Sequence, residues 1–336
     1  MKILKVIGII LAIVIVIAVI LVMVLPTKYN LERSVIIDAP KNIVVDQVVK
    51  FENFVKWSPW SELDPNITYE ITGTDGEVGS AYSWSGNDSV GTGSLSTISI
   101  TDSRIEQKLD FTAPWEAHDL TYYEFEETPE GIEVIWGMDG NLERPMNLMG
   151  LFMSMEDMIG PQYDRGLQSL KNQVTAFIKN HTKRGYFINE IDMKPKYYVL
   201  KRASVKFGDI QNFYATNFEA IMKKVQLLEL PLAGAPSGLM YTWDMENNMA
   251  DMAAGIPISE QADVNGFDVI EVGGKSLQIQ YYGSYAGSAE AHYAMDDYMK
   301  ENGQELNEVV IEEYITDPIN EPDTSKWLTN IYYMVR

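Results

Sequence analysis

The segment from Val309 to Pro318, VVIEEYITDP, places two acids and a phenol in a strand-like pattern. β-Branched and apolar residues predict a strand, and the Asp-Pro pair predicts its end. Successive side chains of a strand point to opposite faces, so Glu312 and Tyr314 share one face and Glu313 lies on the other. A carboxylate beside a phenol could meet an organic cation or orient a water molecule for proton transfer. The same acids could instead be solvated residues of an edge strand.

The composition excludes several other kinds of chemistry. The 336-residue chain has no cysteine, which excludes disulfides, thiol nucleophiles and cysteine-bound metals. Its three histidines, His118, His181 and His292, are far apart in the sequence, so we expect no multi-histidine metal site, no Ser-His-Asp triad and no cofactor. The net charge of -22 disfavours nucleic acid as a partner, because phosphate-binding surfaces need an excess of Lys and Arg. An acidic field attracts cations instead.

An uninterrupted apolar run from Val6 to Leu25 predicts a membrane-spanning helix. At about 1.5 Å per residue, its length matches a hydrocarbon core of about 30 Å. No small-residue cleavage motif follows the run, which favours an uncleaved anchor over residues 1–27 rather than a removed signal peptide. Two lysines before the run predict a cytoplasmic N-terminus and an extracytoplasmic, periplasmic body in a bacterium. Two basic residues soon after the run weaken that prediction.

The stretch from residue 28 to residue 184 predicts a first soluble domain. A strand-like segment at 30–40 precedes a helix-compatible segment at 41–60. Short alternating runs between Thr68 and Met138 then predict a curved antiparallel sheet. Apolar residues at steps of three and four predict a long closing helix: Ile159, Tyr163, Leu167, Leu170, Val174 and Phe177.

This order of elements, together with three sequence segments, resembles the polyketide-cyclase-like branch of the START/Bet v 1 superfamily (SRPBCC). The segments are FENFVKWSPWSELDP at 51–65, GSAYSWSGND at 79–88 and GPQYDRGLQSL at 160–170. The resemblance implies a helix-grip fold, in which a sheet wraps a C-terminal helix around an apolar cavity. It does not imply one activity, since such domains include lipid carriers, cyclases and plain binders.

Trp84 and Trp136 are the candidate ligand-binding residues of that cavity. Met153, Met155 and Met158 lie before the long helix, and methionine suits irregular apolar surfaces. All five residues could equally be ordinary core. No pair of carboxylates in this domain has a spacing that indicates catalysis.

A second soluble domain is predicted from residue 185 to residue 336, with a weak internal repeat of about 75 residues. In both copies a strand leads through a glycine into a helix. When the copies are aligned, Tyr241 corresponds to Glu312 and Trp243 corresponds to Tyr314. Two related strands would then contribute two tyrosines, a tryptophan and one acid to an aromatic cleft.

The second domain resembles the GyrI-like effector-binding domain, which is also the drug-sensing part of several bacterial transcription activators. The resemblance rests on the duplicated β-α-β-β pattern, on YYGSY at 281–285, on the Glu-x-Tyr of Glu312 and Tyr314, and on the ending DTSKWLTNIYYMVR. It implies that Glu312 lies in a cleft and meets cationic aromatic ligands, and that Glu313 does not.

Four aromatic residues are further candidates for ligand contacts in this cleft: Tyr241, Trp243, Tyr282 and Tyr285. Aromatic residues at strand–helix junctions are also often only core. The sequence departs from the transcription activators because we find no helix-turn-helix and no basic DNA-reading segment. We therefore expect a small-molecule ligand and no nucleic acid.

The sequence thus predicts an α+β protein with one transmembrane helix and two soluble domains. Three functions remain open. The first is a membrane-anchored binding protein, with an apolar ligand in the first domain and a cationic or amphipathic aromatic ligand in the second. The second is a hydrolase of small electrophilic compounds that uses Glu312, as the GyrI-like resemblance also allows. The third is an interaction protein whose cavities are vestigial.

Overall fold

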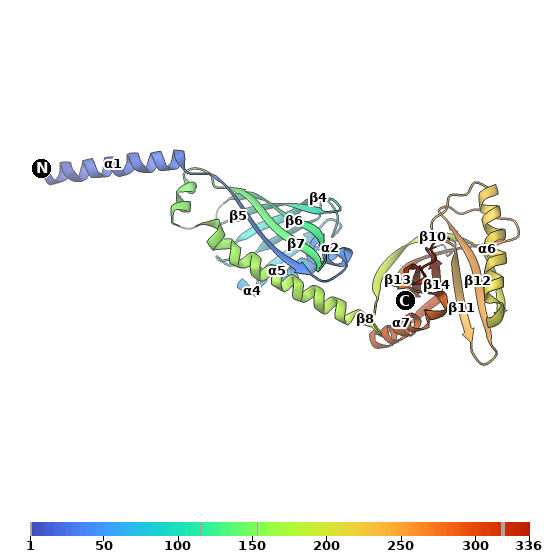
Figure 1. The fold of residues 1–336 in the computed structure, drawn as a ribbon. Coiled ribbons are helices and arrows are strands. Elements are labelled where there is room, and N and C mark those ends of the chain that lie inside the picture. The colour runs from blue at the N-terminus through green and yellow to red at the C-terminus, as the bar shows by residue number, and fades with distance from the viewer. Residues whose placement is uncertain (1, 115, 153, 317–319) are drawn as a thin grey trace. The chain divides into compact units, whose positions relative to one another are not determined.

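The computed structural model describes residues 2–114, 116–152, 154–316 and 320–336, and the chain divides into two compact units (Figure 1). Unit 1 is Met1–Lys179 and unit 2 is Asn180–Arg336. Met153, one of the predicted cavity residues, lies outside the described residues, as does the Asp317-Pro318 pair that was predicted to end a strand.

Unit 1 begins with a single long apolar helix, α1 (Lys2–Val24). The stretch from Lys5 to Val24 is long and apolar enough to cross a membrane, and none of it is buried in the structure. A signal sequence near an N-terminus has the same length and composition. The helix is therefore a candidate membrane span.

Polar side chains from a distant part of unit 1 cap the end of α1. The last carbonyls of a helix have no partner within the helix itself. Asn147 donates from Nδ2 to the carbonyls of Val22 at 2.8 Å and Leu25 at 3.2 Å. Arg144 donates from Nε to the Val22 carbonyl at 3.0 Å. These bonds tie the short 3-10 helix η1 (Met146–Leu151) to the end of α1.

The body of unit 1 is a seven-stranded antiparallel sheet with the strand order β1-β7-β6-β5-β4-β3-β2. The strands are β1 (Lys28–Ile37), β2 (Thr68–Thr72), β3 (Ala81–Ser85), β4 (Thr92–Ile100), β5 (Arg104–Ala113), β6 (Ala117–Thr128) and β7 (Gly131–Asn141). Three short helices connect β1 to β2: α2 (Lys41–Val49), α3 (Phe51–Trp57) and α4 (Trp60–Leu63). In the sheet, the first strand in chain order, β1, pairs with the last, β7.

Helix α5 (Met155–Asn180) packs along one face of this sheet (Figure 1). Its buried residues recur at helical spacing: Gly160, Tyr163, Gly166, Leu167, Leu170 and Val174. The Tyr163 ring stacks on the ring of Trp136 from β7, with centroids 3.9 Å apart and planes at 13°. The structure confirms the predicted long helix, which begins four residues before the first position of its predicted pattern.

Unit 2 is a closed antiparallel barrel with the strand order β10-β12-β11-β14-β15-β13. Its strands are β10 (Asn189–Lys206), β11 (Ser237–Asp244), β12 (Met249–Ile258), β13 (Asp268–Tyr282), β14 (Leu306–Tyr314) and β15 (Leu328–Val335), and the short β8 (Thr182–Lys183) and β9 (Tyr186–Phe187) pair separately. Strand β14 has a neighbour on each side. The interpretation of Glu312 and Glu313 as solvated acids of an edge strand is therefore wrong.

Two helices cover the outer surface of the barrel. Helix α6 (Ile210–Leu227) follows β10, and helix α7 (Ala289–Asn302) follows β13. Three 3-10 segments complete the unit: η2 (Phe207–Asp209), η3 (Tyr285–Gly287) and η4 (Thr324–Lys326). Alternate residues of all six strands fill the barrel interior, and the intervening residues pack against the two helices. The chain thus has the mixed α/β content expected from the sequence.

Removing residues 1–27 should leave both units folded. None of the Lys5–Val24 stretch is buried, and the β1–β7 pairing begins at Lys28, so the truncation removes no core side chain. We expect a soluble chain whose circular dichroism spectrum and thermal unfolding midpoint match those of the full chain in detergent. Aggregation of the truncated chain, or loss of its cooperative unfolding, would contradict this picture.

Candidate functional site

Glu312 and Tyr314 lie on the outer face of β14, on the side that faces the two helices. The Glu312 Oε1 atom is 2.8 Å from His292 Nε2 on α7. The Tyr314 hydroxyl donates to Glu312 Oε2 at 2.9 Å. The Glu312 side chain keeps 14% of its accessible surface. The carboxylate is therefore largely withdrawn from water but still reachable from solvent.

His292 joins this carboxylate to a second phenol. Its Nδ1 atom is 3.0 Å from the Tyr333 hydroxyl on β15, while its Nε2 atom faces Glu312. A contact between Nε2 and a carboxylate is a hydrogen bond only when Nε2 carries a proton. Nδ1 of the neutral ring can then accept from Tyr333. The result is a continuous chain of four polar groups from Tyr333 to Tyr314.

Aromatic rings surround the Tyr314 end of this chain. The Tyr314 ring centroid lies 5.1 Å from that of Tyr285 in η3, with the planes at 66°. On α6, the rings of Tyr214 and Phe218 lie 5.9 and 6.2 Å from Tyr314, also edge to face. Trp327 extends the wall, at 5.1 Å from Tyr285. Edge-to-face rings at these distances attract each other, so the wall is a packed unit. The Glu312 carboxylate is the charged group beside it.

Gly238 on β11 provides the space for these phenols. It is the cross-strand partner of Glu312. A Cβ atom at this position would lie 2.2 Å from the Tyr214 hydroxyl oxygen and 2.9 Å from that of Tyr314. Any side chain here would displace the aromatic wall. A glycine inside a strand is a general sign of such a close approach.

Burial keeps the phenols of the site protonated. Desolvation, reinforced by the charge of Glu312, raises the pKa of Tyr314 well above its ordinary value. The pKa of Tyr214 is raised for the same two reasons. Burial also raises the pKa of Tyr333, with further contributions from Asp296 and Glu312. Three neutral hydroxyl groups therefore surround one carboxylate.

Tyr241 and Trp243, which the repeat alignment matched to Glu312 and Tyr314, lie elsewhere in unit 2. A β-bulge in β11 falls at Tyr241. Tyr241 packs against the core cluster of the barrel interior, with the Arg202 guanidinium 3.5 Å from its ring centroid. Trp243 stacks on Phe207 at 4.4 Å. Neither residue therefore lies beside Glu312: Tyr241 shares the interior face of Leu239, and Trp243 packs near the end of β11.

Tyr282 is also separate from the site, whereas its neighbour Tyr281 belongs near it. Tyr282 is 59% exposed at the end of β13. Tyr281 points to the opposite face, packs in the cluster beneath α7, and donates from its hydroxyl to the Ser284 carbonyl at 2.9 Å. Burial, with smaller contributions that include Glu312, raises its pKa. Strand alternation would have identified Tyr281, because Leu277 and Ile279 share its face.

Sequence reasoning missed five side chains of the site: Tyr214, Phe218, His292, Trp327 and Tyr333. Tyr214 and Phe218 are four residues apart on α6 and therefore share a face, where their rings stack at 5.1 Å. That spacing indicated a buried face, but not that the face meets Glu312. His292 was expected in neither a metal site nor a Ser-His-Asp triad, and no other role was predicted for it. Among the described residues, no group of three His, Cys, Asp or Glu side chains could hold a metal ion.

Trp84 and Trp136 line one small cavity in unit 1. Its volume is 60 Å³, and aromatic and apolar side chains dominate its wall. Trp136 is almost fully buried and donates from Nε1 to Thr121 Oγ1 at 3.1 Å. Trp84 is half-buried and stacks on Tyr82 at 5.7 Å. Of the methionines predicted to line this cavity, Met155 and Met158 are not among its lining residues.

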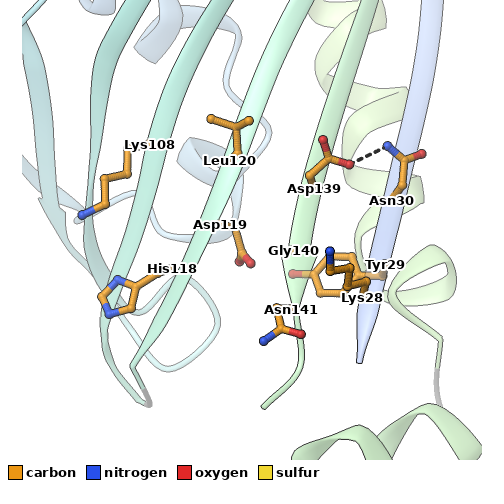
Figure 2. A pocket seen from close by; sticks show the side chains of 10 residues that line it. All are labelled: Lys28, Tyr29, Asn30, Lys108, His118, Asp119, Leu120, Asp139, Gly140 and Asn141. Carbon is orange, nitrogen blue, oxygen red and sulfur yellow. Dashed lines mark hydrogen bonds between the residues drawn. The ribbon is translucent and has the colours of Figure 1, made fainter. Parts of the chain in front are cut away.

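A larger cleft in unit 1, of 810 Å³, was not predicted (Figure 2). Most of its lining residues are of polar types, and they come from the ends of β1, β6 and β7 and from the middle of β5: Lys28, Tyr29, Asn30, Lys108, His118, Asp119, Leu120, Asp139, Gly140 and Asn141. These residues are scattered over more than one hundred positions of the sequence. No local pattern would have brought them together.

Residues 187–336 match the family model of the GyrI-like small molecule binding domain. This part of the chain is therefore a GyrI-like domain, as its resemblance in sequence predicted. The match covers unit 2 apart from its first few residues. No curated protein matches the chain.

The chain is also similar to several solved structures. The C-terminal domain of EcmrR is 16% identical, with a TM-score of 0.40, over 45% of this chain and 98% of that one. EcmrR in a complex with DNA is 13% identical, with a TM-score of 0.41, over 63% of this chain and 88% of that one. A protein from Chromobacterium violaceum is 16% identical, with a TM-score of 0.33, over 44% of this chain and 96% of that one.

The free energy of unfolding should fall as the pH rises above about 10. Burial raises the pKa of Tyr314 and Tyr214 in the folded chain above the ordinary value of 10.0, so the unfolded chain loses these protons first. Their contribution to stability is complete below that pH and is lost as the pH rises towards the folded-state pKa. Tyr314→Phe should make the decline less steep, which urea unfolding at a series of alkaline pH values would measure. Equal slopes for the two proteins would contradict the assignment.

Proposed function

We propose that the chain is a membrane-anchored small-molecule binding protein with a separate ligand site in each unit. In unit 2, the aromatic wall and Glu312 bind a cationic or amphipathic aromatic molecule. The observation that carries this proposal is the Glu312 carboxylate, 14% exposed and beside the ring of Tyr314. The match of this unit to a small molecule binding family supports it.

The contacts at Glu312 are strong enough for a useful affinity. An aromatic face attracts a cation by ~0.5 to 2 kcal/mol, depending on how far both are desolvated. A hydrogen bond to a charged group adds ~1.5 to 3 kcal/mol. Two or three such contacts plus apolar burial reach the ~8 kcal/mol of micromolar binding. Oε1 contacts His292, and a carboxylate oxygen can accept two hydrogen bonds, so a cation can bind Glu312 beside His292.

Unit 1 is proposed to be an SRPBCC helix-grip domain, at residues 28–184, that takes a neutral apolar ligand. The pairing of the first strand with the last, and the packing of α5 on the sheet, support this fold. The 60 Å³ cavity is small beside the about 300–1,000 Å³ of typical ligand sites. A ligand would therefore have to displace a side chain, and the half-buried Trp84 is easier to move than Trp136.

The proposal also assigns a membrane anchor to the chain and an internal duplication to unit 2. Residues 1–27 anchor it through α1, with both units on the extracytoplasmic side. Unit 2 forms the GyrI-like domain at residues 185–336, built from two β-α-β-β repeats. The element order β10-α6-β11-β12 followed by β13-α7-β14-β15 supports that duplication. We propose no DNA binding for this chain, although EcmrR forms a complex with DNA.

Hydrolysis of a small electrophile is the second candidate function. The observation that favours it is the chain of contacts from Tyr333 through His292 and Glu312 to Tyr314. Glu312 or His292 could take a proton from an attacking water molecule, and Tyr314 could donate to the developing negative charge. Turnover that is lost in Glu312→Gln would establish this function in place of simple binding. If the chain shows neither ligand binding nor turnover, the remaining function is that of an interaction protein.

Glu312→Gln should weaken binding of a planar cationic dye by ~1.5 to 3 kcal/mol, or roughly 10- to 150-fold. The substitution keeps the shape of the side chain and removes its charge. Binding of a neutral dye of similar size should not change. Calorimetric titration of each dye into the full chain measures both effects.

Glu260→Gln is the matched control for this experiment, because Glu260 is an exposed acid in the loop after β12. Glu313 is unsuitable as a control. It is 4% exposed, accepts a hydrogen bond from the Ala235 backbone at 3.1 Å and lies 3.5 Å from Lys196 Nζ. Equal losses for the two dyes, or for Glu312→Gln and Glu260→Gln, would refute the cation site.

Trp84→Ala should increase the affinity of the full chain for a neutral apolar dye, because it enlarges the cavity beside Trp136. Added salt should have little effect, since the lining carries no charged side chain. Trp136→Ala should instead destabilise the protein by about 3–5 kcal/mol, as removal of a buried tryptophan does. Fluorescence titration and thermal unfolding measure these effects. Unchanged dye binding in Trp84→Ala would show that Trp84 is only core.

A further inference from the structure

The 810 Å³ cleft of unit 1, here called the β6–β7 cleft, opens where two strands stop pairing. Strands β6 and β7 are paired as far as Leu120 and Asp139. Beyond that pair the strands diverge, and the cleft lies between them (Figure 2). Its volume is within the about 300–1,000 Å³ of typical small-molecule sites. None of the residues proposed above to bind ligands lines it.

Two polar side chains, Tyr29 and Asp119, lie over Gly140 at the floor of the β6–β7 cleft. A Cβ atom at Gly140 would lie 2.1 Å from Tyr29 Cζ and 2.4 Å from Asp119 Oδ1, so both side chains occupy the space that a side chain at 140 would fill. Burial raises the pKa of the Tyr29 phenol, and the adjacent Asp119 adds to this. Burial also raises the pKa of Asp119. Polar groups withdrawn from water at the bottom of a cleft are typical of binding sites.

Basic and acidic groups alternate around the β6–β7 cleft (Figure 2). Lys28 comes from β1, whereas Lys108 and His118 come from β5 and β6 on the other side. Both of the latter contact Asp110, whose Oδ2 atom lies 2.8 Å from Lys108 Nζ. Asp119 and Asp139 lie between these two walls. A purely anionic ligand would meet the carboxylates, and a purely cationic ligand would meet the lysines. The arrangement suits a molecule that carries both charges.

The cleft lies next to the end of α1. Lys28 follows Leu25 by three residues, which places their Cα atoms within about 11 Å of each other. The headgroup layer on each side of a bilayer is about 5–8 Å thick. If α1 spans a membrane, Lys28 and Tyr29 therefore lie at or just beyond the headgroups.

Exposed apolar side chains beside α1 support the same placement. The η1 segment, which Asn147 holds to the end of α1, and the next residue, Phe152, expose them to differing extents: Met146 42%, Met149 38%, Leu151 48% and Phe152 89%. Side chains of this kind next to the end of an apolar helix fit the interfacial layer of a bilayer. The β6–β7 cleft and this apolar segment are thus linked to the same end of the helix.

We propose that the β6–β7 cleft binds the zwitterionic headgroup of a membrane phospholipid. Lys28 meets the phosphate, and Lys108 reaches it by leaving its exposed ion pair with Asp110, because ammonium groups form strong charge-assisted bonds to phosphate oxygens. Asp119 and Asp139 meet the ammonium group of the lipid. The η1 segment dips into the bilayer beside the bound lipid. This inference rests on the proposed anchoring of the chain by α1.

Native mass spectrometry of the full chain, released from maltoside micelles, tests the headgroup site. Phosphatidylethanolamine should bind the wild type at least about tenfold more tightly than the Lys28→Gln/Lys108→Gln variant. Diacylglycerol with the same acyl chains lacks both charges and should bind the two proteins equally. Lys56→Gln/Lys179→Gln removes the same charge from exposed positions of unit 1 and should behave as the wild type.

Three outcomes of that experiment would overturn the headgroup site. Equal phosphatidylethanolamine binding by the wild type and the Lys28→Gln/Lys108→Gln variant is the first. Equal losses of phosphatidylethanolamine and diacylglycerol are the second, because they would place the effect on the acyl chains. Competition by glycerophosphoethanolamine at the same concentration as the lipid is the third, since it would assign the cleft to a soluble zwitterion.

Depth measurements separate failure of this inference from failure of the anchor. Because the chain has no cysteine, Val14→Cys, Phe152→Cys and Ile98→Cys each provide one site for a fluorescent label. In vesicles, spin-labelled lipids should quench labels at 14 and 152, but not the label at the exposed β4 position 98. Quenching at 14 without 152 would overturn the headgroup placement and leave the anchor intact. Quenching at neither position would overturn the anchor itself.

Discussion

A carboxylate that is largely withdrawn from water needs donors for both of its oxygens, or it costs several kcal/mol to bury. At Glu312 these donors come from two different elements, His292 on α7 and Tyr314 on β14 itself. The closed barrel makes this possible, because β14 lies between two other strands and presents alternate residues to the helices outside. The aromatic wall then limits access of water, which strengthens every electrostatic contact that Glu312 makes.

The two proposed ligand sites differ in the chemistry of their linings. Around the small cavity of unit 1, stacked rings such as Trp136 and Tyr163 meet without any charged neighbour in the lining. Around Glu312, similar rings enclose one charge and several phenols. We expect apolar burial to drive binding at the first proposed site, and charge and ring faces to provide selectivity at the second. The two proposed sites of one chain thus suit different ligands, a neutral apolar molecule in unit 1 and an aromatic cation in unit 2.

Local periodicity explains what could be predicted from the sequence. Strand alternation correctly separated Glu312 from Glu313, which accepts hydrogen bonds from Ala235 and Tyr332. Helical spacing likewise identified the buried face of α5. Two features depend on how distant segments pack: the β-bulge at Tyr241, and the approach of His292 on α7 to Glu312. The sequence of a single strand or helix does not predict such packing. The β6–β7 cleft could not be predicted for the same reason.

A crystal structure of the chain with a bound planar organic cation tests the central claim most directly. The account predicts that the cation lies within hydrogen-bonding distance of Glu312, with its ring against Tyr314 and Tyr285. A cation bound elsewhere in unit 2, out of contact with Glu312, would contradict the account.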